Sequence, residues 1–264
     1  MKAGTGFIGC GNMGGALIRA AVKSEGPEHI MITDQLADKA QLLAKETGAC
    51  ACDIKDIAAS CRYIFLGVKP QGMKAMLEEI KDILAVRMDP FVLITMAAGT
   101  PIERIKGYAG DYPVIRIMPN LPVSVGEGMI LYCVSGVSDE DVKAFRDILK
   151  YAGKLCPLEE KLIDAGSAIS GCGPAYVYMF IEALADGGVQ CGLPRDKAML
   201  LASQTVMGSA AHLMETGRHP GELKDKVCSP GGTTIAGVHA LEEKKFRAAV
   251  SDAVLAAYEK TLKL

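Results

Sequence analysis

A turn near the end of the chain carries residues that could bind an anion. Within residues 227–237 a proline and two glycines favour a turn, after which Thr233 and Thr234 begin an apolar run of helical character. The free backbone N–H groups at a helix start attract an anion such as a carboxylate. A threonine hydroxyl in that first turn can reach the same ligand. Taken alone, the segment is explained more simply as a capped helix after a tight turn.

A glycine pattern near the start of the chain predicts a nucleotide-binding loop. Gly9, Gly11 and Gly14 frame Asn12 and Met13 in a Gly-x-Gly-x-x-Gly pattern. The pattern alone is weak, but it follows a short apolar run and begins a predicted helix. In that context the glycines let the backbone approach a pyrophosphate, which lies at the helix N-terminus. A dinucleotide loop at one end and an anion-binding turn at the other suggest a two-part active site.

An acidic residue follows the second predicted strand and bears on the choice of dinucleotide. Asp34 lies 20 residues after Gly14. A carboxylate there hydrogen-bonds the ribose hydroxyls and repels a 2′-phosphate, which favours NADH over NADPH. Lys39 is the nearest positive charge on the C-terminal side, on the next predicted helix. The alternative is a solvent-facing aspartate that begins a turn.

The ends of two further predicted strands could surround the nicotinamide half of the dinucleotide. Ligands of open α/β sheets bind at the carboxyl ends of the strands, where small residues leave room for a ring. The candidate cofactor-binding residues there are Val68, Lys69 and Pro70 after the third strand and Ala97, Ala98 and Gly99 after the fourth. Lys69 could donate to an oxygen of the ligand, or it is an ordinary surface lysine.

Up to residue 160, short apolar runs alternate with amphipathic helical stretches, which predicts a parallel sheet with helices on both faces. The predicted strands are residues 7–8, 30–32, 63–66, 91–94, 114–117 and 127–134, and the predicted helices are 13–24, 37–47, 73–83, 101–108 and 139–151. After residue 160 the strand signals stop. Helices are predicted over residues 163–185, ended by Gly187 and Gly188, and over 193–215, 220–227, 233–243 and 246–262. We therefore expect a Rossmann-type doubly wound domain over 1–160 and an all-helical domain over 161–264.

Composition excludes several classes of protein. The 264 residues carry a formal net charge of -2 without a basic stripe, which argues against nucleic acid or an anionic membrane as a partner. The nine cysteines have no disulfide-framework or zinc-type spacing, so we expect thiols in a reducing compartment, a cytoplasmic protein and no metal site. Residues 165–181 lack formal charge, but residues 170–174 interrupt them, so we expect a buried helix rather than a membrane span.

Six motifs in order closely resemble the pyrroline-5-carboxylate reductase family, across essentially the whole chain. They are residues 7–14, 68–70, 97–99, 116–120, 170–176 and 229–234. The resemblance implies NAD(P)H-dependent reduction of 1-pyrroline-5-carboxylate to L-proline, the last step of proline synthesis. It also implies a helical dimerisation domain that interlocks with a second copy, so that a homodimer is the unit of the assembly. Asp34 departs from the many members that carry residues suited to a 2′-phosphate at this position.

The resemblance also implies roles for residues of the second half. The substrate carboxylate lies against the turn that contains Ser229, Gly231, Gly232 and Thr233. The Thr234 hydroxyl hydrogen-bonds the ring nitrogen, which makes Thr234 the expected catalytic residue. Glu160 matches an acidic position near the bound ring. Histidines 212, 219 and 239 are expected to be core or surface residues.

Three alternative functions differ in what they require. A 3-hydroxyacid dehydrogenase needs a lysine and an asparagine where Val177 and Phe180 stand, so an alcohol proton would have no partner. A reductase of another cyclic imine stays open, because sequence does not measure a ring-sized pocket. A non-catalytic NAD(H) sensor, or a pyridoxal-phosphate carrier, would have no use for the second anion-binding turn at residues 229–234.

Overall fold

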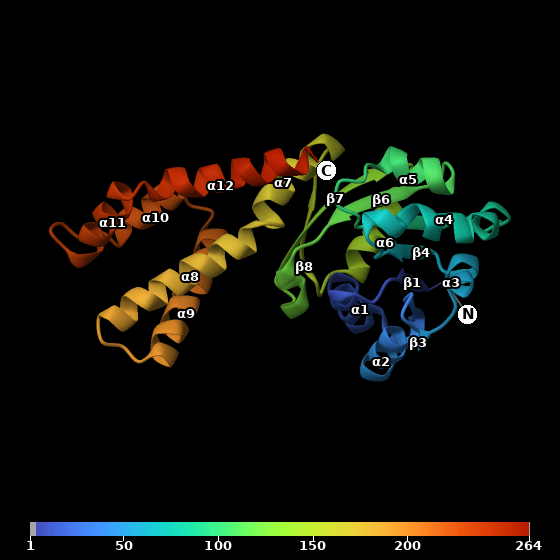
Figure 1. Ribbon diagram of the computed structural model, residues 1–264, viewed down its shortest axis with the longest axis horizontal. Helices are drawn as coiled ribbons and strands as arrows, with labels where there is room; N and C mark the ends of the chain where they lie inside the picture. Colours follow the sequence, from blue (N-terminus) through green and yellow to red (C-terminus); the bar gives the residue numbers. More distant parts are fainter. Residues whose placement is uncertain (1–3, 264) are drawn as a thin grey trace. The chain divides into compact units, whose positions relative to one another are not determined.

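Residues 4–263 are described in a computed structural model that separates into a unit built on a β-sheet and a helical unit (Figure 1). The first unit runs to Gly171 and includes the C-terminal residues from Tyr258, and the second is Cys172–Ala257. This division lies beyond the boundary expected after residue 160. The reason is that helix α7 (Glu160–Ser170) packs on strand β7 of the sheet.

The sheet has eight strands in the order β3-β2-β1-β4-β5-β6-β7-β8. The strands are β1 Thr5–Ile8, β2 Ile30–Thr33, β3 Cys50–Ala51, β4 Tyr63–Leu66, β5 Val92–Thr95, β6 Val114–Met118, β7 Gly128–Ser135 and β8 Gly153–Pro157. The first six are parallel, whereas β7 pairs antiparallel with β6 and carries β8 parallel to itself. The parallel sheet that the sequence predicts therefore comprises β1 to β6, whereas β7 and β8 run in the opposite direction. The nine-residue connection from β6 to β7 is too short for a crossover, which takes a dozen or more residues.

Helices cover both faces of this sheet, as the alternation of strands and helices predicted. They are α1 Asn12–Glu25, α2 Ala37–Thr47, α3 Ile54–Ser60, α4 Pro70–Ala85, α5 Ile102–Ala109, α6 Asp139–Ile148 and α7. Successive strand residues point to opposite faces. Phe7 and Phe65 accordingly pack in one buried cluster with α1, α2 and α6, whereas Ile8 and Ile64 pack in another with α3, α4, α5 and α7.

Two short strands and one short helix of the first unit, β3, β8 and α3, carry no clear signal in the sequence. β3 has two exposed residues at the sheet edge and therefore no apolar run. β8 contains a lysine and a proline and is only half-buried. α3 spans seven residues and begins with a capping box. The Asp53 side chain accepts a hydrogen bond from the Lys55 amide, and the Asp56 side chain accepts one from the Asp53 amide.

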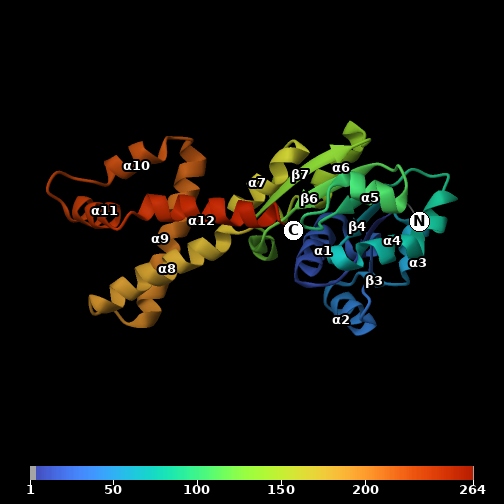
Figure 2. The same ribbon diagram turned by 45° about the horizontal axis from the view of Figure 1, so that its top comes forward.

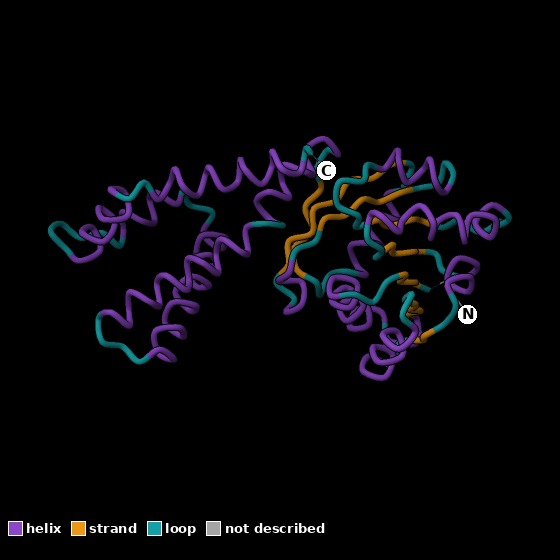
Figure 3. The backbone as a smooth tube through the Cα atoms, viewed as in Figure 1, coloured by secondary structure: helices purple, strands orange, loops and turns teal. Residues whose placement is uncertain are grey.

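The described part of the second unit contains helices and loops (Figure 3). Its helices are α8 Gly173–Gln190, α9 Arg195–Thr216, α10 Pro220–Lys226 and α11 Thr233–Glu243, followed by α12 Phe246–Thr261, which extends into the first unit. α8 and α9 lie side by side in both ribbon views (Figures 1 and 2). Their contact uses small residues: Ala185, Ala198 and Ala202 are buried there, and a Cβ on Gly188 would lie 3.3 Å from the Cβ of Ala198.

Two helix boundaries differ from the prediction. The stretch 163–185 is two helices, because the chain turns at Gly171 and Cys172 between α7 and α8. The pair Gly187 and Gly188 does not end α8, which continues to Gln190. The Gly188 carbonyl instead accepts the amides of Cys191 and Leu193, which closes the helix C-terminus after the glycines.

The second unit leaves much of its apolar surface uncovered. In α8 only Ala185 is buried, and the Met179 side chain is 68 % exposed. The segment Glu160–Gln190, which comprises α7 and α8, has the length and the mean hydropathy (1.2) that a membrane-crossing helix would need. Within its most apolar 18 residues, 11 % are buried. Length and hydropathy alone are weak grounds for a membrane span. The prediction of a buried helix is thus wrong for the isolated chain. Helix α8 has an apolar face that no other part of residues 4–263 covers.

Candidate active site

The glycine loop between β1 and α1 has the geometry of a phosphate cradle. Gly9 has φ +114°, and a Cβ there would lie 2.5 Å from the Gly67 carbonyl oxygen. A Cβ on Gly14 would lie 2.1 Å from the Gly9 carbonyl oxygen. At Gly11, by contrast, a Cβ would meet nothing within 4 Å. Gly9 and Gly14 therefore shape the turn, whereas Gly11 leaves open space above the helix start.

The first turn of α1 keeps its backbone N–H groups available. Gly11 is the N-cap, and no side chain caps the helix. Asn12 is exposed and Met13 half-buried. Such a terminus, with the positive end of the helix dipole, suits a phosphate group. The loop therefore fits a dinucleotide pyrophosphate.

Asp34 follows β2 and is hydrogen-bonded to the glycine loop. Its Oδ2 accepts the backbone amide of Cys10 at 2.7 Å, and its Oδ1 accepts the amide of Leu36 at 2.9 Å. This is more than a solvent-facing aspartate at a turn, since the carboxylate joins two loops. Burial and the neighbouring Asp34 raise the pKa of the Cys10 thiol to about 12, so this cysteine stays protonated.

The register of the strands brings the other cofactor candidates to one edge of the sheet. Ile8 pairs with Leu66, and Leu66 with Thr95, so β1, β4 and β5 end together. The glycine loop, residues 67–70 and residues 97–99 follow these three ends. Lys69 is exposed as the N-cap residue of α4, and Pro70 is the first residue of that helix. The structure thus gathers all the predicted cofactor-binding residues in the first unit.

The turn at residues 229–234 belongs to the second unit and begins α11. Gly231 has φ +68°, a left-handed conformation that favours glycine. The Gly232 amide donates to the Ser229 carbonyl at 3.0 Å, and a Cβ on Gly232 would lie 2.2 Å from Ser229 Oγ. Gly232 is the N-cap of α11 without a side-chain cap bond, and Thr233 and Thr234 are exposed. The start of α11 therefore presents open N–H groups and two hydroxyls.

Glu160 is committed to contacts inside the first unit. Its Oε1 accepts the backbone amide of Ile102 at 2.7 Å and lies 3.3 Å from Nη1 of Arg116. A second guanidinium nitrogen, Nη2, donates to Asp164 at 2.8 Å. Arg116 was not predicted to have a role of its own, although an arginine within an otherwise apolar strand is a signal for a buried charged network.

Asn120 is a second polar residue that sequence reasoning left without a role. Its Nδ2 donates to the Ser170 carbonyl at 2.9 Å, and its Oδ1 accepts the Met129 amide at 2.8 Å. Arg116 and Asn120 therefore hold opposite ends of α7, through Glu160 at its start and Ser170 at its end. The 116–120 motif has a clear structural function in fixing this helix.

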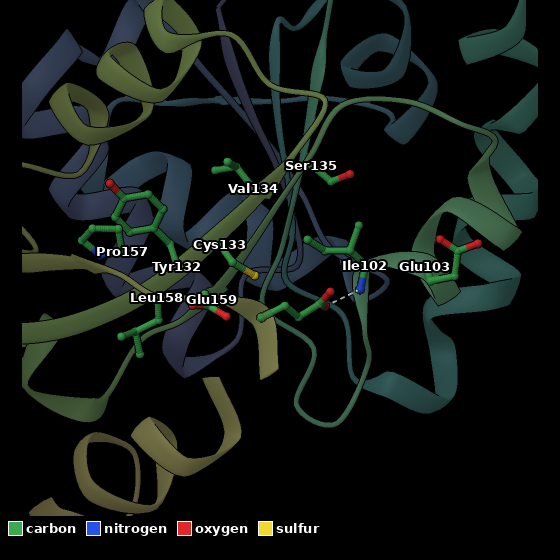
Figure 4. A pocket seen from close by; sticks show the side chains of 10 residues that line it. Ile102, Glu103, Tyr132, Cys133, Val134, Ser135, Pro157, Leu158 and Glu159 are labelled. Atoms are coloured by element: carbon green, nitrogen blue, oxygen red, sulfur yellow. Dashed lines mark hydrogen bonds between the residues drawn. The ribbon is translucent and has the colours of Figure 1, made fainter. Parts of the chain in front are cut away.

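A hollow of about 600 Å³ lies beside Glu160, and its lining is drawn in Figure 4. The lining residues come from the start of α5, from β7 and from the segment after β8, and include Tyr132, Cys133 and Glu159. None of the predicted nucleotide-loop residues lines it. Burial, followed by the nearby Glu160 carboxylate, raises the pKa of the Cys133 thiol to about 11, so this cysteine is not a ready nucleophile.

Residues 4–263 contain no cluster of three or more His, Cys, Asp or Glu side chains that could hold a metal ion. His219 serves a local purpose, since its Nδ1 accepts the Gly221 amide at 3.1 Å and caps α10. His239 lies on exposed α11 beside Glu243.

Known proteins resemble the chain over its whole length. Pyrroline-5-carboxylate reductase from Escherichia coli (strain K12) is 41 % identical, with 100 % of this chain and 99 % of that relative covered. The chain belongs to the pyrroline-5-carboxylate reductase family. A family model described as pyrroline-5-carboxylate reductase dimerisation matches residues 160–264, and one described as NADP oxidoreductase coenzyme F420-dependent matches residues 5–98.

Two solved structures of the family agree with this chain in fold. The pyrroline-5-carboxylate reductase of Coxiella burnetii gives a TM-score of 0.92 at 30 % identity, covering 100 % of this chain and 98 % of the other. The Plasmodium falciparum enzyme with NADP bound gives 0.86 at 34 % identity, covering 98 % and 97 %. The predicted fold class, a Rossmann-type domain followed by a helical dimerisation domain, is confirmed.

Proposed function

We propose that this protein catalyses the NAD(P)H-dependent reduction of 1-pyrroline-5-carboxylate to L-proline, the last step of proline synthesis. The observation that carries the proposal is its 41 % identity to a pyrroline-5-carboxylate reductase over 100 % of this chain and 99 % of that relative. The intact glycine loop and the open start of α11 supply the two binding functions that this reaction requires.

The dinucleotide is held by the residues at the carboxyl ends of β1, β4 and β5. The amides of the first turn of α1 would hold its pyrophosphate, and residues 68–70 and 97–99 would bind the nicotinamide half. When bound, the cofactor supplies the hydride. Asp34 favours NADH, because its carboxylate would repel the 2′-phosphate of NADPH.

The substrate carboxylate is received by the N–H groups that begin α11, next to Ser229, Gly231, Gly232 and Thr233. The Thr234 hydroxyl hydrogen-bonds the ring nitrogen and fixes the orientation of the imine. Most of the rate enhancement comes from this orientation and from electrostatic placement. A strong general acid is unnecessary if the imine arrives protonated.

We further propose that the protein works as a homodimer or a larger assembly built from it. The support is the exposed apolar surface of α8 and α9, where Leu200 is 61 % and Met207 61 % exposed. Surfaces of this kind mark interaction sites, and residues 160–264 match a dimerisation family. We place the protein in the cytoplasm, in keeping with its nine free cysteines.

The direct test is turnover of 1-pyrroline-5-carboxylate with each reduced dinucleotide. Appearance of L-proline with loss of cofactor absorbance is the expected result. Tight cofactor binding without turnover would refute the substrate assignment.

A further inference from the structure

Arg116 is a buried arginine that joins strand β6 to two carboxylates of α7. The residue is 2 % exposed and lies opposite Thr95 of β5 in the strand register. Its guanidinium reaches Glu160 and Asp164, which stand one helical turn apart on the same helix. A buried charge is tolerated only when it is paired, so both carboxylates are needed to hold this arginine in place.

Glu160 extends the network to helix α5. The Ile102 amide that donates to it belongs to the first residue of that helix, and Figure 4 shows this bond as a dashed line ending at Ile102. A carboxylate at a helix N-terminus satisfies an otherwise unpaired N–H group and interacts well with the helix dipole. Glu160 thereby fixes the start of α5 with respect to Arg116.

This network holds the end of the turn between β5 and α5, through the bond between Glu160 and the Ile102 amide. The turn contains the cofactor candidates Ala97, Ala98 and Gly99, with Gly99 at φ +64°. At the start of the turn, the Ala97 amide donates to Oγ1 of Thr95, the last residue of β5, at 3.3 Å. Thr95 pairs with Arg116 through the strand register alone. After the turn comes Ile102, whose amide Glu160 accepts. A shift of Glu160, or of Arg116 that pairs with it, would therefore move the end of the cofactor turn.

We propose that Arg116 and Glu160 are positioning residues that set the turn at residues 97–99 against the dinucleotide. Asp164 completes the pairing of Arg116. This proposal rests on the proposed function only in taking residues 97–99 as part of the cofactor site. It assigns Glu160 to cofactor placement, in place of the substrate-ring contact that the family resemblance implies.

One feature makes the network sensitive to small changes. The Nε of Arg116 is buried, and within residues 4–263 it has no hydrogen-bond partner. The guanidinium therefore depends on its two Nη contacts, and a partly satisfied buried network loses its geometry readily when one partner changes. Loss of charge at Glu160 alone should loosen the arginine and with it the turn.

The test measures dinucleotide affinity directly, by calorimetric titration of the full-length protein with NADH and NADPH without substrate. Arg116→Met and Glu160→Gln are the variants, and Arg116→Lys is the conservative one. We expect the Kd for the dinucleotide to rise by about tenfold in the first two and to recover in part in the lysine variant. The KM for 1-pyrroline-5-carboxylate at saturating dinucleotide should change less than about twofold.

Arg62→Met is the matched control. Arg62 pairs with Asp141 at 2.7 Å, next to the amino end of β4 and away from the cofactor edge. The Arg62→Met variant should have a lower Tm than the wild type and an unchanged dinucleotide Kd. An unchanged dinucleotide Kd in both Arg116→Met and Glu160→Gln would overturn the proposal, as would a rise confined to the substrate KM of Glu160→Gln. If Arg116→Met fails to fold, the dinucleotide Kd values of Glu160→Gln and Arg116→Lys test the proposal instead. Because the titration measures dinucleotide binding without turnover, its result does not depend on whether the assigned substrate is correct.

Discussion

The backbone amide of Cys10 donates a 2.7 Å hydrogen bond to the carboxylate of Asp34. This bond ties the glycine loop after β1 to the loop after β2. The residue expected to select the dinucleotide therefore also fixes the loop that binds it. Substitutions at this position should alter both cofactor preference and loop order.

Replacing Asp34 by serine should shift preference toward NADPH. Removal of the carboxylate removes its repulsion of the 2′-phosphate, so we expect the ratio of kcat/KM for NADPH to that for NADH to rise by about tenfold, equivalent to about 1.4 kcal/mol. Steady-state kinetics with both cofactors measures this ratio. Asp34→Asn, which keeps an acceptor for the loop but removes the charge, separates the two effects. A ratio that stays constant in both variants would refute the account of Asp34.

Two glycine substitutions in one loop should behave differently. Gly11→Ala adds a methyl group where nothing lies within 4 Å, so we expect an unchanged Tm but dinucleotide affinity weakened by about tenfold. Gly14→Ala places a Cβ 2.1 Å from a backbone oxygen and should lower the Tm as well. Thermal melts and calorimetric titration test both. Wild-type affinity in Gly11→Ala would mean that the open space is not the pyrophosphate site.

Thr234→Val removes a hydroxyl while keeping nearly the same side-chain shape. If this hydroxyl bonds the ring nitrogen, its loss should cost about 1–3 kcal/mol of transition-state stabilisation, or roughly a 5- to 150-fold fall in kcat/KM for the imine. Thr233→Val, one residue earlier on the same exposed helix start, is the matched control and should lose less. Turnover at the wild-type rate in Thr234→Val would exclude Thr234 as the catalytic residue.

Asp141 should make the stability of the first unit depend on pH. Burial by itself raises the pKa of this carboxyl, but hydrogen bonds from Ser138, Arg62 and Tyr63 lower it overall. A folded-state pKa below the unfolded value of about 3.9 stabilises the protein above that pH, and this contribution is lost as the pH falls through the folded pKa.

Asp141→Asn should therefore cost about 1.5–3 kcal/mol of unfolding free energy at pH 7. Urea unfolding at pH 7 and at successively lower pH should show that the difference in unfolding free energy between wild type and variant becomes smaller in acid. The exposed Asp147, paired with Lys143, provides Asp147→Asn as a control with little effect. A gap that stays constant with pH would contradict the assigned pKa direction.

The apolar face of the helical unit should be an interface between two copies. Met207→Glu places a charge on a residue that is 61 % exposed in the single chain. If the face is covered in a dimer, light scattering should show dissociation toward the monomer, whereas Lys45→Glu on α2 should leave the mass unchanged. A wild-type chain that is monomeric at micromolar concentration would contradict the proposed assembly.

Local sequence patterns were sufficient to predict most of the sheet unit. β4 is a continuous apolar run with no residue exposed, which a buried parallel strand requires. β3 and β8 lie at the two edges of the sheet and lack such runs. The reversed direction of β7 follows from the short connection between β6 and β7. This direction could not be predicted without knowing that β7 pairs with β6.

The polar contacts of the site were less predictable, because they join residues far apart in the chain. Glu160 bonds Ile102, 58 residues away, and Arg116 reaches Asp164 across 48 residues. Only the register of β5 and β6 and the packing of α7 bring these groups together. The glycine loop, by contrast, is a local motif, and its predicted shape appears in the structure.

Parallel assays of NADH and NADPH oxidation with 1-pyrroline-5-carboxylate test the central claim most directly. We expect formation of L-proline with both donors and a larger kcat/KM for NADH, because the Asp34 carboxylate would repel the 2′-phosphate of NADPH. Dinucleotide binding without any oxidation in the presence of this imine would contradict the proposed reaction, and a larger kcat/KM for NADPH would contradict the role given to Asp34.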